Sequence, residues 1–336
     1  MHARPPTIVR LEDDREFAVD AGDTLLSAAL RAGVGFPHEC CAGGCGACRF
    51  ELLDGSVQDL WPDAPGLSAR DRARGRKLAC QSRPLEGCKV KVRTAAEYVP
   101  PVRPARRRLT LEGTTDLTGD LREFRFRASD PAHFRAGQFA LLSLEGIDRP
   151  RAYSMSNLPN DDGSWQFIIR RVPGGRGSTF LFDGLRPGDS VNVDGPYGGA
   201  WFREESQRDI ICIAGGSGLA PALSIARAAS ASGNVRRIHF FYGARTPADV
   251  CGEAQLAQLE GYPDRIAYRV AVSEPDAEWR GTTGFIHELV EAEFGSRLAE
   301  FDFYFAGPPP MVTAVQEMLA VRHLVPHGQI HFDRFF

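Results

Sequence analysis

The chain has 336 residues, 43% of them hydrophobic and 25% charged, and its formal net charge is −3. These shares are those of a globular protein with room for two or three domains, and so small a net charge argues against nucleic acid or a membrane surface as a partner. No apolar run approaches the ~18 residues of a membrane span, and the opening residues lack the apolar segment of a secretory signal. We therefore expect a cytoplasmic protein whose eight cysteines are kept reduced.

Residues 1–96 are expected to form the first domain. Alternating apolar residues predict two strands joined by a turn, and Asp23 is the expected N-cap of the helix that follows them. The pair Asp54-Gly55 is a strong turn signal that predicts a hairpin, and residues 88–92 are typical of a closing strand. Together these elements predict a small unit of helix and sheet.

Four cysteines of this unit have the C-x4-C-x2-C spacing, with one more cysteine at a distance, that plant-type [2Fe–2S] proteins use. They are Cys40, Cys45, Cys48 and Cys80. The glycines between them, Gly43, Gly44 and Gly46, are expected to take positive φ angles, so that backbone N–H groups point at the sulfurs. The spacing thus predicts four thiolate ligands for a two-iron cluster.

Other uses of these cysteines fit the pattern less well. A disulfide framework is typical of short secreted chains, and a structural zinc site usually has two C-x2-C pairs, whereas this segment has one. The spacing does not need Cys41. Cys88, Cys212 and Cys251 lack ligand spacing and are expected to be buried as small hydrophobic residues.

The rest of the chain divides into a linker and two further domains. Residues 97–108 are rich in proline and arginine, as linkers are. Residues 109–206 hold regular short strands separated by turn residues, which predict a small barrel or sandwich. From 207 to 336, apolar strands alternate with helices, including one expected from about 220 to 231. This alternation predicts a parallel sheet with a nucleotide at its carboxyl edge.

Two motifs in residues 109–206 suit a flavin. In RAYSMS, Arg151 can pair with a phosphate, the Tyr153 ring can lie along the flavin, and Ser154 can hydrogen-bond flavin N5. In VPGGRGST, a glycine-rich turn leads into a helix start that can hold an anion. Alone, each motif is equally well an ordinary strand end or polar loop, but together they can hold both ends of one flavin. The residues assigned to the flavin are Arg151, Ala152, Tyr153, Ser154, Ile168, Arg170, Val172, Gly175, Gly177, Ser178 and Thr179.

Three loops in the last domain suit a nicotinamide nucleotide. AGGSGLAP follows a strand and opens a helix, although it is not a strict G-x-G-x-x-G. AGPPPM ends a later strand and forms either a wall of the nicotinamide pocket or simply a helix start. In the loop GARTPAD, Arg245 could take a 2′-phosphate and Asp249 could reject one, which leaves NADH and NADPH open. The residues assigned to the nucleotide are Gly215, Gly216, Ser217, Gly218, Arg245, Gly307 and Pro308.

Two further segments allow two interpretations each. The chain ends in Phe335 and Phe336, and one of these rings could cover the flavin face until nicotinamide displaces it; a last strand packed in the core would explain them as well. Residues 69–77 hold four arginines and one lysine against one aspartate. They form either a solvated charged segment or a surface for an acidic redox partner.

The order of these motifs resembles that of the NAD(P)H-dependent reductase components of bacterial aromatic-ring-hydroxylating oxygenases. The likeness extends over nearly the whole chain and rests on the four cysteines, RAYSMSN, RRVPGGR, GGSGLAP and AGPPPM. HECCAGGCGACRF and IHFDRFF are similar to the carbazole 1,9a-dioxygenase branch of that family, and LACQS and VPGGR to the naphthalene dioxygenase branch. One departure is Ala306, where many relatives in the wider superfamily have a cysteine, so no catalytic role is assigned there.

The resemblance implies a β-grasp-like plant-type ferredoxin domain, a six-stranded antiparallel FAD-binding barrel over 109–206, and a parallel-sheet NAD(P)H-binding domain over 207–336. It implies electron transfer from NADH, with NADPH as the alternative donor, through FAD and the [2Fe–2S] cluster. The acceptor would be a Rieske-type or plant-type ferredoxin, or the terminal oxygenase of an aromatic dioxygenase system.

Site residues and alternatives follow from the same resemblance. Ser154 and Tyr153 are the expected residues of the hydride-transfer site, with Phe336 as a lid, and the chain is expected to act as a monomer. The reductase of a di-iron monooxygenase or of an O-demethylase would have the same domains. A redox sensor that binds the nucleotide without catalysis is the remaining alternative.

Overall fold

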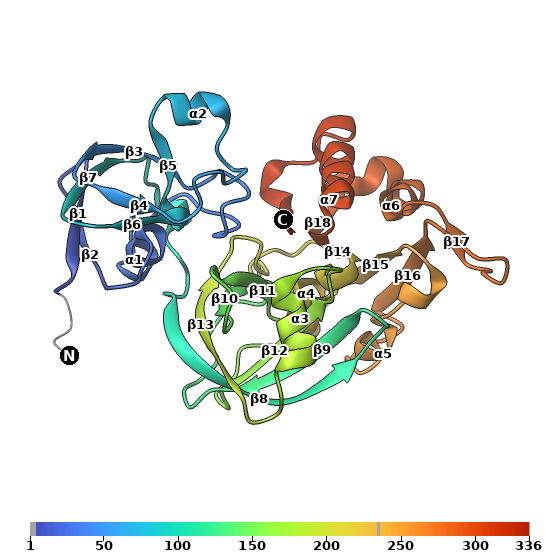
Figure 1. The fold of residues 1–336 in the computed structure, drawn as a ribbon. Coiled ribbons are helices and arrows are strands. Elements are labelled where there is room, and N and C mark those ends of the chain that lie inside the picture. Colours follow the sequence, from blue (N-terminus) through green and yellow to red (C-terminus); the bar gives the residue numbers. More distant parts are fainter. Residues whose placement is uncertain (1–4, 234–235, 336) are drawn as a thin grey trace. The chain divides into compact units, whose positions relative to one another are not determined.

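The computed structural model of the chain describes residues 5–233 and 236–335 (Figure 1). The chain divides into two compact units, one made of residues 1–106 with 194–198 and the other of residues 107–193 with 199–336. Within the described residues, no helix is both long and apolar enough to span a bilayer.

The first unit is built on a mixed five-stranded sheet of order β2-β1-β7-β3-β5. Neighbours β1 and β7 run parallel, and the other neighbours run antiparallel. The strands are β1 (Thr7–Leu11), β2 (Glu16–Val19), β3 (Arg49–Asp54), β5 (Arg76–Leu78) and β7 (Cys88–Lys91). The helix α1 (Leu25–Arg31) buries every residue except its last, and the short α2 (Ala69–Ala73) precedes β5. This arrangement confirms the expected ferredoxin-like class of the unit.

The N-cap of α1 differs from the prediction. Thr24 caps the helix, because its Oγ1 accepts a hydrogen bond from the Ser27 backbone N–H at 3.1 Å, so the prediction of Asp23 is wrong. Asp23 is instead buried and forms ion pairs with Arg31 and Arg106. A buried carboxylate needs such partners, since an unpaired buried charge is costly.

The turn at Asp54-Gly55 exists, but the hairpin expected there does not. Gly55 has φ 84° and reverses the chain. Strand β3, which precedes the turn, pairs with β7 and β5. Strand β4 (Val57–Asp59), which follows the turn, pairs with β6 (Ser82–Pro84) in a separate two-stranded sheet. The local turn signal therefore predicts the reversal correctly, while long-range pairing decides which strands meet.

The second unit contains a six-stranded antiparallel sheet of order β11-β10-β13-β8-β9-β12, which curls into a nearly closed barrel. An isolated bridge between Met155 and Phe167 brings the two edges together. The strands are β8 (Ala105–Asp116), β9 (Leu121–Arg127), β10 (Phe139–Ser143), β11 (Arg151–Ser154), β12 (Ser164–Arg170) and β13 (Ser190–Tyr197). Because β8 begins at Ala105, the last four residues of the expected linker lie in a strand, continuous with the buried Leu109 and Leu111.

A six-stranded parallel sheet of order β17-β16-β15-β14-β18-β19 completes this unit. Its strands are β14 (Ile210–Gly215), β15 (Ile238–Ala244), β16 (Ile266–Val272), β17 (Thr282–Thr283), β18 (Asp302–Gly307) and β19 (Ile330–Arg334). Its helices are α4 (Leu219–Ala231), α5 (Glu253–Leu256), α6 (Ile286–Phe294) and α7 (Pro309–Gln316).

Helices cover both faces of this sheet. Alternate residues of the wholly buried β14 belong to different cores, since Ile210 and Cys212 pack with α4 whereas Ile211 and Ile213 pack with α6 and α7. The expected parallel sheet is confirmed, with the helix predicted near 220–231 at Leu219–Ala231.

Candidate functional site

The four predicted cluster cysteines lie together in the first unit as two pairs. The Cys48 and Cys80 sulfurs are 3.3 Å apart, and the Cys45 thiol donates to the Cys40 sulfur. Cys48 and Cys80 are buried, whereas Cys40 and Cys45 are half-buried. Cys41 turns away and its thiol donates to the Glu39 carbonyl at 3.8 Å, so the loop does not direct it toward the pairs.

Backbone N–H groups of the loop point at these sulfurs, as the sequence predicts. The Cys40 sulfur accepts from the N–H groups of Ala42 and Cys45, and the Cys45 sulfur accepts from the N–H of Ala47, each at 3.4 Å. The hydrogen bond from the Cys45 thiol and these N–H groups lower the pKa of Cys40 to about 5. The same thiol–sulfur hydrogen bond and burial raise the pKa of Cys45, and a hydrogen bond with Cys48 and burial raise the pKa of Cys80. Because a metal binds the thiolate form, cluster binding would displace the protons of these two thiols.

Positive φ angles occur at two of the three expected glycines. Gly43 has φ 90° and Gly46 has φ 77°, but Gly44 is not in this region, so the prediction for Gly44 is wrong; Cys41, with φ 52°, supplies the additional turn. Gly46 also has no room for a side chain, because a Cβ there would lie 2.3 Å from the Gly66 carbonyl oxygen.

The paired arrangement fits a cluster of two irons better than a single metal ion. Among residues 5–233 and 236–335, no three His, Cys, Asp or Glu side chains are grouped as ligands of one metal ion. Four cysteines serve a [2Fe–2S] cluster, with two for each iron. The Cys40–Cys45 and Cys48–Cys80 pairs supply that division, so the residues present fit the group.

In the barrel, the two predicted flavin motifs lie against each other. Strand β11 holds the first motif, and the second leads into the short helix α3 (Arg176–Thr179). A Cβ on Gly177 would lie 3.3 Å from Cγ of Arg151, so the glycine lets the arginine lie across the start of α3. The guanidinium donates to the Arg149 carbonyl at 2.9 Å, and its Nε would lie 3.7 Å from that Cβ. It therefore lies beside the start of α3, where N–H groups without a partner within the helix make a suitable place for a phosphate.

Ser154 and Tyr153 have surroundings that suit contact with a bound ring. The Ser154 side chain is 4% exposed, and its Oγ has no hydrogen-bond partner among the described residues. Such a buried hydroxyl costs free energy unless something else satisfies it. Burial raises the pKa of Tyr153 to about 12, which keeps its phenol neutral. An unsatisfied hydroxyl beside a neutral aromatic ring fits a flavin.

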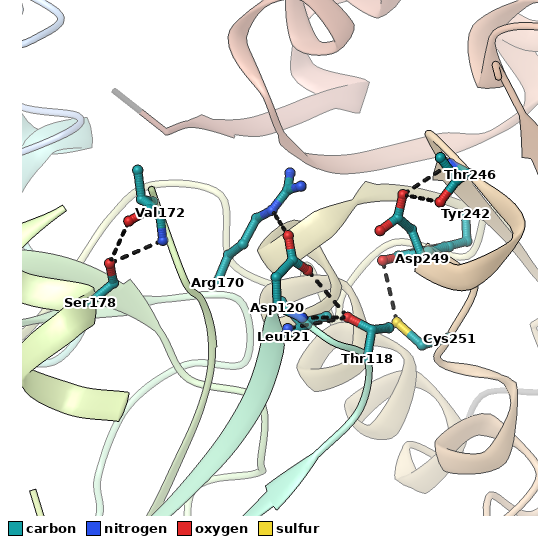
Figure 2. A network of polar contacts seen from close by, with 10 residues as sticks. All are labelled: Thr118, Asp120, Leu121, Arg170, Val172, Ser178, Tyr242, Thr246, Asp249 and Cys251. Carbon is teal, nitrogen blue, oxygen red and sulfur yellow. Dashed lines mark hydrogen bonds and ion pairs between the residues drawn. The ribbon is translucent and has the colours of Figure 1, made fainter. Parts of the chain in front are cut away.

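Several other residues assigned to the flavin already make contacts within the protein. The Ser178 hydroxyl accepts from the Val172 N–H at 3.0 Å and so holds its own loop together (Figure 2). The Ile168 side chain is packed in the core, so a ligand would meet only its backbone. Arg170 forms an ion pair of 2.6 Å with Asp120 (Figure 2). Ala152 and Thr179 lie in β11 and α3, beside the residues just described.

A cavity of about 440 Å³ opens at the carboxyl edge of the parallel sheet. Four of the residues predicted for the nucleotide line it: Gly215, Gly216, Arg245 and Pro308. Its size and position are those of a nucleotide pocket in a fold of this kind. The Asp249 carboxylate also lines the cavity, where it accepts from the Thr246 backbone N–H at 2.9 Å and hydroxyl at 2.8 Å (Figure 2).

The remaining predicted nucleotide residues bring strand ends close together. A Cβ on Gly218 would lie 1.9 Å from the Ala306 carbonyl oxygen, and one on Gly307 would lie 2.7 Å from Cε of Met311. Ser217 lies between the glycines in a single helical turn that leads into α4. These residues hold the end of β14 against the end of β18 and so shape the cavity floor.

Several cavity residues escaped the sequence analysis. The Phe285 ring is 61% exposed and stacks on His287 with ring centres 5.9 Å apart. Asp120 and Thr118 come from the barrel, and Met311 from α7. An exposed phenylalanine at a helix start is an available signal for Phe285, but nothing local marks Asp120 as a neighbour of the glycine loop.

Two further predictions concern the remaining cysteines and the C-terminus. Cys88 and Cys212 are buried as expected, whereas Cys251 is partly exposed and donates to the Tyr242 hydroxyl at 3.3 Å (Figure 2). Strand β19 agrees with the interpretation of the C-terminus as a last strand, and Phe336 lies outside the described residues.

Comparison with known proteins gives three family matches in the order that the folds suggest. A 2Fe-2S iron-sulfur cluster binding domain matches residues 9–85, an oxidoreductase FAD-binding domain matches 108–202, and an oxidoreductase NAD-binding domain matches 212–317. The boundaries 1–96, 109–206 and 207–336 remain our proposal.

Individual relatives match over almost the whole chain. Ferredoxin–NAD(P)⁺ reductase CarAd of Metapseudomonas resinovorans is 43% identical, over 98% of this chain and 99% of the relative. The ferredoxin–NAD⁺ reductase component of the alkene monooxygenase system of Xanthobacter autotrophicus is 39% identical, over 97% and 100%. The reductase component of the naphthalene 1,2-dioxygenase system of Pseudomonas putida is 34% identical, over 96% and 97%.

A solved structure agrees. The ferredoxin reductase in carbazole 1,9a-dioxygenase has a TM-score of 0.93 and 40% identity, with both chains covered to 100%. The resemblance to the carbazole and naphthalene dioxygenase branches is confirmed. With its cluster-binding, FAD-binding and NAD-binding domains, the chain belongs to the family of ferredoxin–NAD(P)⁺ reductase components of oxygenase systems.

Proposed function

We propose that this chain is the NADH-dependent reductase of an aromatic ring-hydroxylating dioxygenase system. Electrons would pass from NADH through FAD and the [2Fe–2S] cluster to a separate Rieske-type or plant-type ferredoxin, or directly to a terminal oxygenase. The observation that carries this proposal is the arrangement of four thiols in two pairs, in one chain with a nucleotide cavity.

The barrel residues would hold and orient the flavin. When bound, FAD accepts a hydride from nicotinamide, and the cluster passes electrons on singly. Arg151 and the start of α3 would bind phosphate, and Tyr153 would lie along the ring system. The Ser154 hydroxyl, which lacks a partner among the described residues, would hydrogen-bond at flavin N5 and so hold the position that hydride reaches.

The cavity residues would hold the nicotinamide nucleotide. The backbone of Gly215 and Gly216 allows a pyrophosphate to approach, and Pro308 provides a rigid wall. The exposed ring of Phe285 offers a flat apolar face to a base.

Donor choice depends on the rim of this cavity. The Asp249 carboxylate caps Thr246, whereas the Arg245 guanidinium has no ion-pair partner among the described residues and is available for a 2′-phosphate. We propose NADH as the usual donor, as the name of the alkene monooxygenase relative states for that protein, with NADPH used less well.

The acceptor is the part of this proposal that needs reconstitution. The purified protein, NADH and candidate ferredoxins and oxygenases are combined, and the oxidation of a panel of aromatic compounds is measured. Hydroxylated aromatic products that require this protein would support the proposal. Failure to reduce any candidate acceptor, in a preparation that holds flavin and iron, would overturn it.

A second candidate comes from the 39% identity to the alkene monooxygenase reductase. The same domains would then serve a monooxygenase. The same panel separates the two, because alkenes would be oxidised in place of arenes when a monooxygenase component is supplied.

We further propose that the protein works as a monomer in the cytoplasm. The eight cysteines, all of which lie among the described residues, form no disulfide, which fits a reducing compartment. Sedimentation at micromolar concentration tests the oligomeric state, and a dimer would contradict it.

A further inference from the structure

An unbalanced group of arginines surrounds α2 in the first unit. Residues 60–78 carry five basic side chains and two acidic ones. With Arg49 from β3, five exposed arginines form what we term the α2 arginine face, namely Arg49, Arg70, Arg72, Arg74 and Arg76.

Little on this face neutralises the charge. Asp71 is the buried carboxylate beneath it and accepts from Arg49 at 3.1 Å and Arg76 at 3.0 Å. Hydrogen bonds from Ser68 and Arg76 lower the pKa of Asp71 to about 2, so it contributes a single negative charge at neutral pH. Arg70 and Arg74 have no ion-pair partner among the described residues.

The opposite situation holds on the β1–β2 edge of the same unit. There each acidic side chain meets a base, in the pairs Arg10–Glu16, Arg15–Asp13, Lys89–Asp14 and Lys91–Glu12. In Figure 1, α2 lies apart from β1 and β2. Charge is thus balanced at one end of the unit and strongly positive at the other.

The positive end is also the end that holds the cluster cysteines. Arg49 directly follows Cys48, and the Ala79 N–H that donates to the Cys48 carbonyl at 3.0 Å directly precedes Cys80. The segment before α2 is fixed to the cysteine loop, since the Gly66 N–H donates to the Gly43 carbonyl at 2.9 Å.

A second connection fixes α2 itself. Arg72 donates to the carbonyls of Pro62 at 3.2 Å and Ala64 at 2.7 Å, which lie just before Gly66. The face therefore has a fixed place beside the thiols, and a protein docked on it would approach the cluster.

We propose that the α2 arginine face is the docking surface for an acidic one-electron carrier protein, and this inference rests on the proposed function. Two carriers would be reduced for each NADH, with one electron passing at each encounter and one proton released on formation of NAD⁺. Opposite charges raise encounter rates by about 10- to 1,000-fold at low salt, and salt removes the effect.

The test uses the full protein with two haem proteins of opposite charge as probes. The soluble domain of cytochrome b5 is acidic and cytochrome c is basic, and each accepts one electron. The double variant R70E/R74E reverses two unpaired charges of the face. K89E/K91E makes the same change in net charge on β7 and serves as the control.

At low ionic strength, R70E/R74E is expected to lower kcat/KM for cytochrome b5 at least about tenfold, while cytochrome c reduction stays equal or rises. K89E/K91E should stay within about twofold for cytochrome b5, and all rates should converge near 1 M salt. Equal effects of the two double variants, or equal slowing of both haem proteins by R70E/R74E, would overturn the docking surface.

Two checks separate this result from other failures. Iron content and the visible spectrum of each variant show whether the unit is intact; if R70E/R74E loses iron, R70Q/R74Q takes its place and should give a smaller change in the same direction. If the unmodified protein reduces neither haem protein with NADH, the proposed function fails, and not the docking surface.

Discussion

The cysteine loop and the nucleotide loop both depend on glycine, but for different reasons. In the cysteine loop, Gly46 takes φ 77° and lies against Gly66, so that neighbouring N–H groups aim at sulfur. In the nucleotide loop, Gly218 has an ordinary helical φ of −60° and is needed because the Ala306 carbonyl leaves no room for a Cβ. One glycine shapes a ligand-wrapping turn, and the other lets two strand ends meet.

This difference shows which segments of the chain set the geometry of each site. Three of the predicted cluster cysteines come from one nine-residue loop, so the geometry of that loop is largely local. The nucleotide cavity is enclosed by the ends of several strands, a barrel loop and two helices. Changes in the first should affect electron output alone, whereas changes in the second should affect nucleotide use.

The largest expected effect comes from Cys48→Ser, which removes one of the two buried thiols among the four predicted cluster ligands. The variant should lose iron and NADH-dependent cytochrome c reduction to background while its flavin is still reduced by NADH. Iron analysis and stopped-flow absorbance measure both. Cys41→Ser, in the same loop, is the control and should keep its iron; equal loss in both would contradict the ligand assignment.

Gly218→Ala tests the nucleotide loop. Because Gly218 has an ordinary helical φ, alanine can adopt the same backbone conformation. The added Cβ must displace the end of β18, at a cost of about 1–3 kcal/mol of stability, and should raise KM for NADH at least about tenfold. Thermal unfolding and steady-state kinetics are the measurements. Gly328→Ala, where a Cβ would have no atom within 4 Å, is the control. An unchanged KM in Gly218→Ala would show that the close approach is not required.

Ser154→Ala separates a functional hydroxyl from a structural one. Because Ser154 Oγ has no partner among the described residues, its removal should leave the melting temperature of the flavin-free protein unchanged or raised. Flavin reduction by NADH should slow about tenfold, corresponding to the loss of one hydrogen bond at the reacting ring. Ser156→Ala, whose hydroxyl is equally buried and unpartnered, should slow it less than about twofold. Similar rates in both variants would remove Ser154 from the proposed site.

The smallest effect is expected at the cavity rim. Arg245→Ala should lower kcat/KM for NADPH about fivefold, since an exposed charge pair contributes about 1 kcal/mol or less, and should leave NADH within about twofold. Parallel decreases for both donors would show that Arg245 does not contact a 2′-phosphate.

Much of this organisation could be predicted because its signals are local. The cysteine spacing, the buried strand β14 and the helix α4 each show in a short window of sequence. Failures occurred where a distant segment decided the outcome. Asp23 forms an ion pair with Arg106 instead of capping its helix, and β4 pairs with β6 instead of with β3 across the turn.

The unpredicted part of the nucleotide cavity has the same cause. Phe285 and Asp120 lie more than 60 residues from the glycine loop, and only the folded topology brings them to its edge. The wrong prediction for Gly44 is a smaller error. Cys41 adopts a positive φ in this loop, although glycine adopts that conformation more readily.

The most direct test of the account is an anaerobic titration of the purified protein with NADH, followed by visible absorbance. If electrons enter at the nucleotide cavity and leave through the paired cysteines, the flavin and iron–sulfur bands should both bleach, with uptake of about three electrons per chain. Complete flavin bleaching with unchanged iron–sulfur absorbance at equilibrium would contradict it.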